Sequence, residues 1–232
     1  MGVVKWFEMK IFALNNLEPM DDLTFRKLLT NISDEKRERI KKFAKLDDAK
    51  MVLLADVLIR SVIASELKVS SKTIEFNSNK YGKPFLKGNS RLHFNVSHSR
   101  DWIVCVIDNE SVGIDIEKIR PIGFDLFEQF FSVEEYNTLI AKNPEKWQLF
   151  FFDLWTLKES YIKAVGKGFS IPLKSVTINF LKKGEITVKL DNKLTNWAIK
   201  QYDLDPDYKT SVCGTNKAFP DNVMIKKLKY IC

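Results

Sequence analysis

The sequence predicts an α+β fold, and two capped helical segments together with several short apolar segments support this prediction. Ser33 followed by two acids is typical of a helix start, because its hydroxyl can cap free amides and the acids favour the positive end of the helix dipole. Ser132 and Glu135 form a capping box ahead of another helix. Apolar segments of strand length surround these helices, so both parts of the chain mix helices with strands.

The first part of the chain is expected to combine strands with two helical regions. The expected strands are residues 9–14, 92–97, 102–108 and 112–117. The expected helical regions are residues 21–29 and a pattern from Ser33 to about Leu67, with a break near residues 46–48. Six residues of this pattern share one helical face and are assigned to the core: Leu53, Leu54, Val57, Leu58, Ser61 and Val62. Residues 78–84 are rich in turn formers and predict a turn.

The second part is expected to hold two helices followed by strands. One helix opens at Ser132, and Pro144 suits the first turn of the next, which should end near residues 166–168 where two glycines occur. The expected strands cover residues 175–180, 185–190, 197–202 and 210–213.

Composition and cysteine usage exclude several classes of protein. No apolar run reaches the roughly 20 residues needed to cross a membrane, and the first residues carry no signal-peptide segment. We therefore expect a cytoplasmic protein with no membrane partner. Cys105, Cys213 and Cys232 are odd in number and widely spaced, so neither a zinc site nor a disulfide framework is expected.

The chain carries a net charge of +7, with its densest basic cluster in the second helical region. This cluster comprises Lys36, Arg37, Arg39, Lys41, Lys42 and Lys45. A solvated helix face is the ordinary explanation of such a run. The cluster lacks the interleaved aromatic residues of a single-strand nucleic-acid binder. We therefore expect phosphates or an acidic protein partner rather than nucleic acid.

Three carboxylates and two lysines, Lys158 and Lys163, are the strongest chemical signal. Asp115 and Glu117 lie two residues apart in a predicted strand and so share one face, opposite the isoleucines between and before them. Glu159 and Lys163 lie four apart in a predicted helix and also share a face. If strand and helix meet, three oxygen ligands converge beside ammonium groups. This arrangement predicts a site for Mg²⁺ and a phosphate ester.

Four ordered motifs give the chain a resemblance to a known family. They are Tyr81-Gly82-Lys83-Pro84, Phe94-Asn95-Val96-Ser97-His98-Ser99, Gly113-Ile114-Asp115-Ile116-Glu117, and Trp155 through Lys163 followed by Gly166-Lys167-Gly168. The chain resembles the 4′-phosphopantetheinyl transferases of the surfactin-synthetase-activating (Sfp) type from Met9 onwards. The resemblance implies two similar α+β halves with the ligand site between them, residues 9–112 and 113–232. Residues 1–8 are then an N-terminal extension.

The resemblance also implies the reaction. The phosphopantetheine arm of coenzyme A (CoA) moves to a serine of an acyl or peptidyl carrier protein, with Mg²⁺ as cofactor, and adenosine 3′,5′-bisphosphate leaves. Asp115, Glu117 and Glu159 are the implied metal ligands. Glu159, directly or through a metal-bound water, is the preferred base for the serine proton, and His98 is the competing candidate.

Further residues are implied to hold CoA by the same resemblance. His98 and Lys163 are expected at the pyrophosphate and are also assigned to catalysis. The complete expected set for CoA is Lys36, Arg39, Lys83, Ser97, His98, Lys158 and Lys163. One departure from the family pattern is Met51, which falls where an arginine often lies near the 3′-phosphate.

Two kinds of alternative remain open from the sequence. The enzyme serves either the carriers of peptide, polyketide and fatty-acid synthesis or the fatty-acid carrier alone; its length favours the broad, monomeric type. A non-catalytic protein that binds CoA or a carrier is the rival of another class, and the intact carboxylates and Lys163 argue against it.

Overall fold

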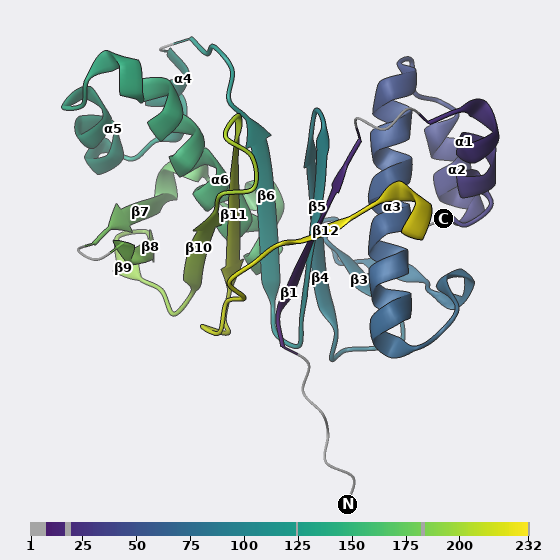
Figure 1. Cartoon of the computed structure of the whole chain (residues 1–232). Coiled ribbons are helices and arrows are strands. Elements are labelled where there is room, and N and C mark those ends of the chain that lie inside the picture. The colour runs from purple at the N-terminus through teal and green to yellow at the C-terminus, as the bar shows by residue number, and fades with distance from the viewer. Residues whose placement is uncertain (1–7, 17–19, 124, 182–183, 232) are drawn as a thin grey trace, which may run out of the picture.

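A four-stranded sheet and its covering helices form the first part of the molecule. The computed structural model of the protein describes residues 8–16, 20–123, 125–181 and 184–231. The strand order is β12-β1-β5-β4, all antiparallel except the β12–β1 pair. The strands are β1 (Lys10–Asn15), β4 (His93–Ser99), β5 (Trp102–Asp108) and β12 (Met224–Lys226). The long helix α3 (Leu46–Leu67) covers one face of this sheet (Figure 1).

The second part repeats this plan with a different sheet. Its strands are β6 (Val112–Lys118), β10 (Ala198–Tyr202) and β11 (Tyr208–Gly214), in the antiparallel order β10-β11-β6. Helix α6 (Trp147–Val165) packs on this sheet, with Thr156 Oγ1 2.8 Å from Ser211 Oγ of β11. The prediction of an α+β fold is confirmed.

Smaller elements complete both parts. The remaining helices are α1 (Asp22–Leu29), α2 (Asp34–Ile40), α4 (Asp125–Phe130) and α5 (Val133–Ile140). The remaining strands are β2 (Phe76–Ser78), β3 (Pro84–Leu86), β7 (Val176–Phe180), β8 (Ile186–Leu190) and β9 (Lys193–Leu194). Strands β2 and β3 form a hairpin around the predicted turn, and β7, β8 and β9 form a separate sheet.

Local sequence signals predicted several helix ends correctly. The Ser33 side chain accepts a hydrogen bond from the Lys36 amide, and both reciprocal bonds of the Ser132–Glu135 capping box are present. Helix α6 ends at Gly166, whose φ of +73° suits a residue without a β-carbon. The long helical pattern breaks at residues 41–45 rather than near residues 46–48, since α3 already begins at Leu46.

The two sheets share a buried core. Ile11 and Ala13 of β1, Val104 of β5, and Ile114 and Ile116 of β6 are all fully buried and belong to one apolar cluster. Strands β4 and β6 run beside each other where the sheets meet. Burial of this surface holds the two parts together, because apolar surface removed from water stabilises the contact in proportion to its area.

The C-terminal segment returns to the first sheet. Strand β12 pairs with β1 in parallel (Figure 1). Ile231 is buried in the same apolar core as the residues of α3. The predicted second half, residues 113–232, includes β12 and Ile231. In the structure both lie against elements of the first part. Residues 1–7 of the predicted extension lie outside the described residues. Within the described part of the chain, no helix has the length and apolar character to cross a membrane.

Candidate active site

Strand β6 presents its two carboxylates as the sequence predicts. Ile114 and Ile116 are fully buried in the core between the sheets, while Asp115 and Glu117 face α6. Gly113 allows this close approach: a β-carbon there would lie 2.2 Å from the Ser160 carbonyl oxygen and 2.3 Å from the Ala164 nitrogen. The glycine of this motif therefore sets the distance between strand and helix.

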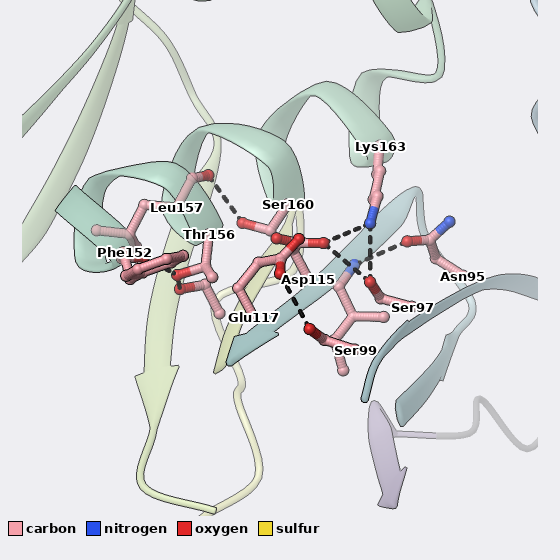
Figure 2. A network of polar contacts seen from close by, with 12 residues as sticks. Asn95, Ser97, Ser99, Asp115, Glu117, Phe152, Thr156, Leu157, Ser160 and Lys163 are labelled. Carbon is pink, nitrogen blue, oxygen red and sulfur yellow. Dashed lines mark hydrogen bonds and ion pairs between the residues drawn. The ribbon is translucent and has the colours of Figure 1, made fainter. Parts of the chain in front are cut away.

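Helix α6 presents one stripe of side chains to the same space. Trp155, Glu159 and Lys163 lie four residues apart and line one cavity together with Asp115 and Glu117. The Lys163 ammonium lies 2.5 Å from Asp115 Oδ1 (Figure 2). Strand and helix thus meet as the spacing of their charged residues predicts.

Strand β4 supplies the third side of the site through alternate residues. Ser97 donates to Asp115 Oδ1 at 2.9 Å and accepts from Lys163 at 2.9 Å. Ser99 donates to Glu117 Oε2 at 3.0 Å, and Asn95 Oδ1 accepts from the Ile114 amide at 2.9 Å (Figure 2). These bonds fix the two carboxylates of β6 against the neighbouring strand. Asn95 and Ser99 were not among the predicted site residues, because the sequence does not show which strand lies beside β6.

The cavity has a volume of about 800 Å³ and combines polar and apolar walls. Its polar residues include Ser97, His98, Gln129 and Lys174 in addition to the carboxylates and Lys163. Its apolar wall comprises Val96, Phe130, Trp155, Phe169, Ile171, Pro172 and Leu173. Phe169 is 97% exposed although it is aromatic. Most residues of this apolar wall were not predicted from the sequence, because apolar residues on short connections follow no regular period.

The carboxylates have the chemistry of a hard-cation site. Asp115 Oδ2 is buried and has no hydrogen-bond partner among the described residues. Burial raises the pKa of Glu117 and of Glu159, and the negative charge of Asp115 raises both further. A divalent cation among these oxygens would offset this repulsion, and Mg²⁺ prefers such ligands. As they stand, no three acidic, histidine or cysteine side chains of the described residues are gathered closely enough to enclose an ion.

His98 follows the site serine on β4 and is exposed to the cavity. Burial of its ring lowers the pKa of His98, and the positive charge of Lys163 lowers it further. The imidazole is therefore neutral at neutral pH and can donate from one nitrogen and accept at the other. His93, the other histidine, lies outside this cavity.

Lys158 does not reach the cavity. Its side chain is 1% exposed, and its ammonium lies 2.5 Å from Glu135 and donates to the carbonyls of Phe130 and Leu173. Because an α-helix has about 3.6 residues per turn, Lys158 projects from a different face of α6 than Glu159 and Lys163 do. The expected contact of Lys158 with the phosphates does not fit this geometry.

The other basic residues expected at CoA also lie away from the main cavity. Lys36 is 2.6 Å from Asp56, a buried carboxylate that also pairs with Arg60. Arg39 is exposed on α2. Met51 is 7% exposed and packs in the core beneath the first sheet. Lys83 lines a second cavity of about 290 Å³, which also includes Glu159, Lys163 and Phe169.

Comparison with known proteins identifies the family. The model of the 4′-phosphopantetheinyl transferase superfamily matches residues 111–213, and that of the N-terminal part of 4′-phosphopantetheinyl transferases matches residues 18–110. The chain is 38% identical over 215 residues to 4′-phosphopantetheinyl transferase Sfp of Bacillus subtilis, covering 93% of this chain and 96% of that protein. It is 39% identical over 221 residues to the psf-1 transferase of Bacillus pumilus, covering 94% of each.

Among solved structures, the chain is similar to a holo-(acyl-carrier-protein) synthase from Bacillus anthracis in complex with CoA (3′,5′-ADP). The TM-score is 0.38 at 18% identity, over 45% of this chain and 93% of the other. The relatives that match nearly end to end carry the assignment: the chain belongs to the 4′-phosphopantetheinyl transferase family and is an enzyme of its Sfp type.

Proposed function

We propose that this transferase takes the 4′-phosphopantetheine arm from CoA, attaches it to a serine of an apo carrier protein, and releases adenosine 3′,5′-bisphosphate. One observation carries the proposal beyond the family assignment. Asp115, Glu117, Glu159, Lys163 and His98, which come from three elements, line one cavity large enough for a substrate. Groups of both signs thus surround a single space, as transfer of a charged phosphoryl group requires.

Asp115, Glu117 and Glu159 are the proposed ligands of Mg²⁺. When bound, the ion would neutralise charge on the pyrophosphate and stabilise the negative charge that develops on the leaving oxygens. Lys163 would contribute a fixed positive charge beside it, since its ammonium is already held by Asp115 and Ser97. His98 would donate a hydrogen bond to a pyrophosphate oxygen at the other side of the cavity.

Glu159 is the proposed base for the carrier serine. It lies between Trp155 and Lys163 on the half-buried stripe of α6 that lines the cavity. Its carboxylate makes no hydrogen bond to another residue in the described part of the chain, so an incoming hydroxyl can approach it. His98 and a metal-bound water are the competing candidates. The proposed contacts of Lys36 and Arg39 with CoA concern the periphery of this site, whereas the proposed contact of Ser97 lies at its centre, beside Asp115 and Lys163.

The proposed partners are acidic carrier proteins or carrier domains of peptide, polyketide or fatty-acid synthesis. The exposed side chains of Arg39 on α2 and of Lys41 and Lys42, which directly follow this helix, supply complementary charge. The enzyme is proposed to act as a monomer, because β4, β6 and α6 of one chain provide every proposed catalytic group.

The proposal is tested by incubating the protein with CoA, Mg²⁺ and an apo carrier and measuring the intact mass of the carrier. A gain of one phosphopantetheine is expected. A carrier with its acceptor serine replaced by alanine, and a reaction containing a chelator, should show no gain. An unmodified carrier in the complete reaction, with CoA nonetheless bound to the protein, would favour a non-catalytic CoA-binding role.

A further inference from the structure

The turn that joins β2 to β3 makes contacts with α6 that the family assignment does not explain. The Lys83 ammonium donates to the carbonyl oxygens of Ala164 at 2.9 Å and Val112 at 3.0 Å. The Asn79 side chain donates to the carbonyl oxygen of Gly166 at 2.8 Å. These three bonds join segments more than 25 residues apart in the sequence. They link the turn both to the C-terminal end of α6 and to the first residue of β6.

Two of the three acceptors, the carbonyl oxygens of Ala164 and Gly166, lie at the C-terminal end of α6. The last carbonyls of a helix have no intrahelical amide to bind, and they carry the negative end of the helix dipole. A cation or an amide donor at this end stabilises it. Burial lowers the pKa of Lys83 to about 8, yet both the ammonium and the neutral amine have enough hydrogens for two carbonyls.

The turn is itself built for this contact. Asn79 Oδ1 accepts from the amides of Tyr81 at 2.9 Å and Lys83 at 3.0 Å, so its side-chain nitrogen points outward to Gly166. A β-carbon on Gly166 would lie 2.6 Å from Lys83 Cδ. The hairpin is anchored in the first part of the molecule, because Leu86 belongs to the core beneath α3 and Phe76 packs on Phe94.

We propose that Asn79 and Lys83 form a clasp that holds the C-terminal turn of α6 against β6 and so positions Lys163 and Glu159. Lys163 directly precedes Ala164, the residue that Lys83 holds. Lys83 is then a positioning residue that acts through α6, rather than a contact of the nucleotide 3′-phosphate. The kinetic test of the clasp rests on the proposed function, because it measures transfer. The hydrogen-exchange test does not.

Replacement of Lys83 by methionine tests the clasp, because methionine retains most of the apolar stem and removes the donor. Transfer should be measured with CoA and with 3′-dephospho-CoA, which lacks the 3′-phosphate. We expect kcat/KM to fall by roughly tenfold to a hundredfold, a typical cost of misplacing a reacting group. The fold decrease in kcat/KM should be the same for CoA and for 3′-dephospho-CoA. A fall with CoA alone would assign Lys83 to the 3′-phosphate and overturn the proposal.

Asn79→Asp is the second variant, since aspartate keeps the oxygen that supports the turn and replaces only the donor to Gly166. This variant should lower kcat/KM by the same factor with CoA and with 3′-dephospho-CoA. It tests the clasp on its own if Lys83→Met does not fold. Lys87→Met is the matched control: Lys87 lies on the same hairpin, its ammonium is 2.7 Å from Glu75, and it is 59% exposed. This control should retain wild-type kinetics.

Hydrogen exchange provides a readout independent of catalysis. In either clasp variant the amides of residues 162–166 should exchange faster than in the wild type, while the amides of β5 should not change. Unchanged exchange in both variants would overturn the clasp even if activity fell. If the wild type transfers from neither donor, the proposed function fails, and exchange alone still decides whether the clasp exists.

Discussion

Lys163 joins the three elements of the site, because its ammonium contacts Asp115 of β6 and Ser97 of β4 from its place on α6. Lys158, five residues earlier, makes equally close contacts in the interior with Glu135. The difference follows from the period of the helix, which directs residues five apart to different faces. Position on the helix, rather than residue type, decides which lysine lines the cavity.

Asp115→Asn should abolish transfer while leaving the fold intact. The amide cannot supply the charge that holds Lys163, and it is a poorer ligand for a hard cation. Transfer to an apo carrier and circular dichroism provide the two measurements. Asp153→Asn is a matched control on α6, since Asp153 pairs with Lys209 at 2.8 Å away from the cavity. Near-normal turnover of Asp115→Asn at limiting Mg²⁺ would contradict the metal assignment.

Glu159→Gln should lower the rate of transfer by roughly a hundredfold or more, the usual contribution of a positioned acid–base group. Glutamine keeps the shape and one oxygen but cannot accept the serine proton. Single-turnover rates across a Mg²⁺ titration, with CoA binding measured by calorimetry, separate the two possible roles. Recovery of most of the rate at saturating Mg²⁺ would make Glu159 a ligand only and favour His98 or a metal-bound water as the base.

At the scale of elements, the contact of β6 with α6 sets the geometry of the site. Gly113→Ala should destabilise the protein by at least about 2 kcal/mol, because the new methyl group would meet backbone atoms that cannot move aside. Thermal unfolding measures the loss. Gly214→Ala on the adjacent strand is the control, since its β-carbon would meet the flexible end of Met9 at 3.0 Å and would otherwise make only ordinary contacts, with the carbonyl oxygens of Asn216 at 3.7 Å and Ser111 at 3.8 Å. Equal stability of the two variants would refute the close packing.

Helix α2 should affect capture of substrates rather than the chemical step. The basic residues of α2, and Lys41 and Lys42 directly after it, do not line the main cavity, and Lys41 already pairs with Glu38 at 2.6 Å on the surface. Lys41→Glu with Lys42→Glu should raise the KM for carrier or CoA with little change in kcat, because charges outside the reacting centre mainly steer association. Steady-state kinetics at two salt concentrations test this. A large loss of kcat at saturating substrates would count against it.

Local sequence signals predicted the elements well for a physical reason. Ser33, Ser132 and Gly166 act on atoms within a few residues of themselves, so their effect is visible in the sequence. The face shared by Asp115 and Glu117 is local in the same sense. Strand β12 was not predicted, because it is three residues long and gains its stability by pairing with a strand near the other end of the chain.

At the scale of the whole molecule, the site depends on how two parts of the chain meet. The sequence indicated which residues carry chemistry, but it could not show that β4 lies beside β6 or that Lys83 contacts α6. Both depend on the packing of segments far apart in the sequence. This is why the stripe from Trp155 to Lys163 was predictable, while the orientations of Lys158 and Lys83 were not.

We propose that the residues lining the main cavity transfer phosphopantetheine from CoA to a carrier serine. The most direct measurement follows both products of one reaction: holo carrier by intact mass and adenosine 3′,5′-bisphosphate by chromatography. The account predicts that the two appear at the same rate and in equal amounts, and that neither appears with Asp115→Asn. Release of the nucleotide without modification of the carrier, or a modified carrier without the nucleotide, would contradict it.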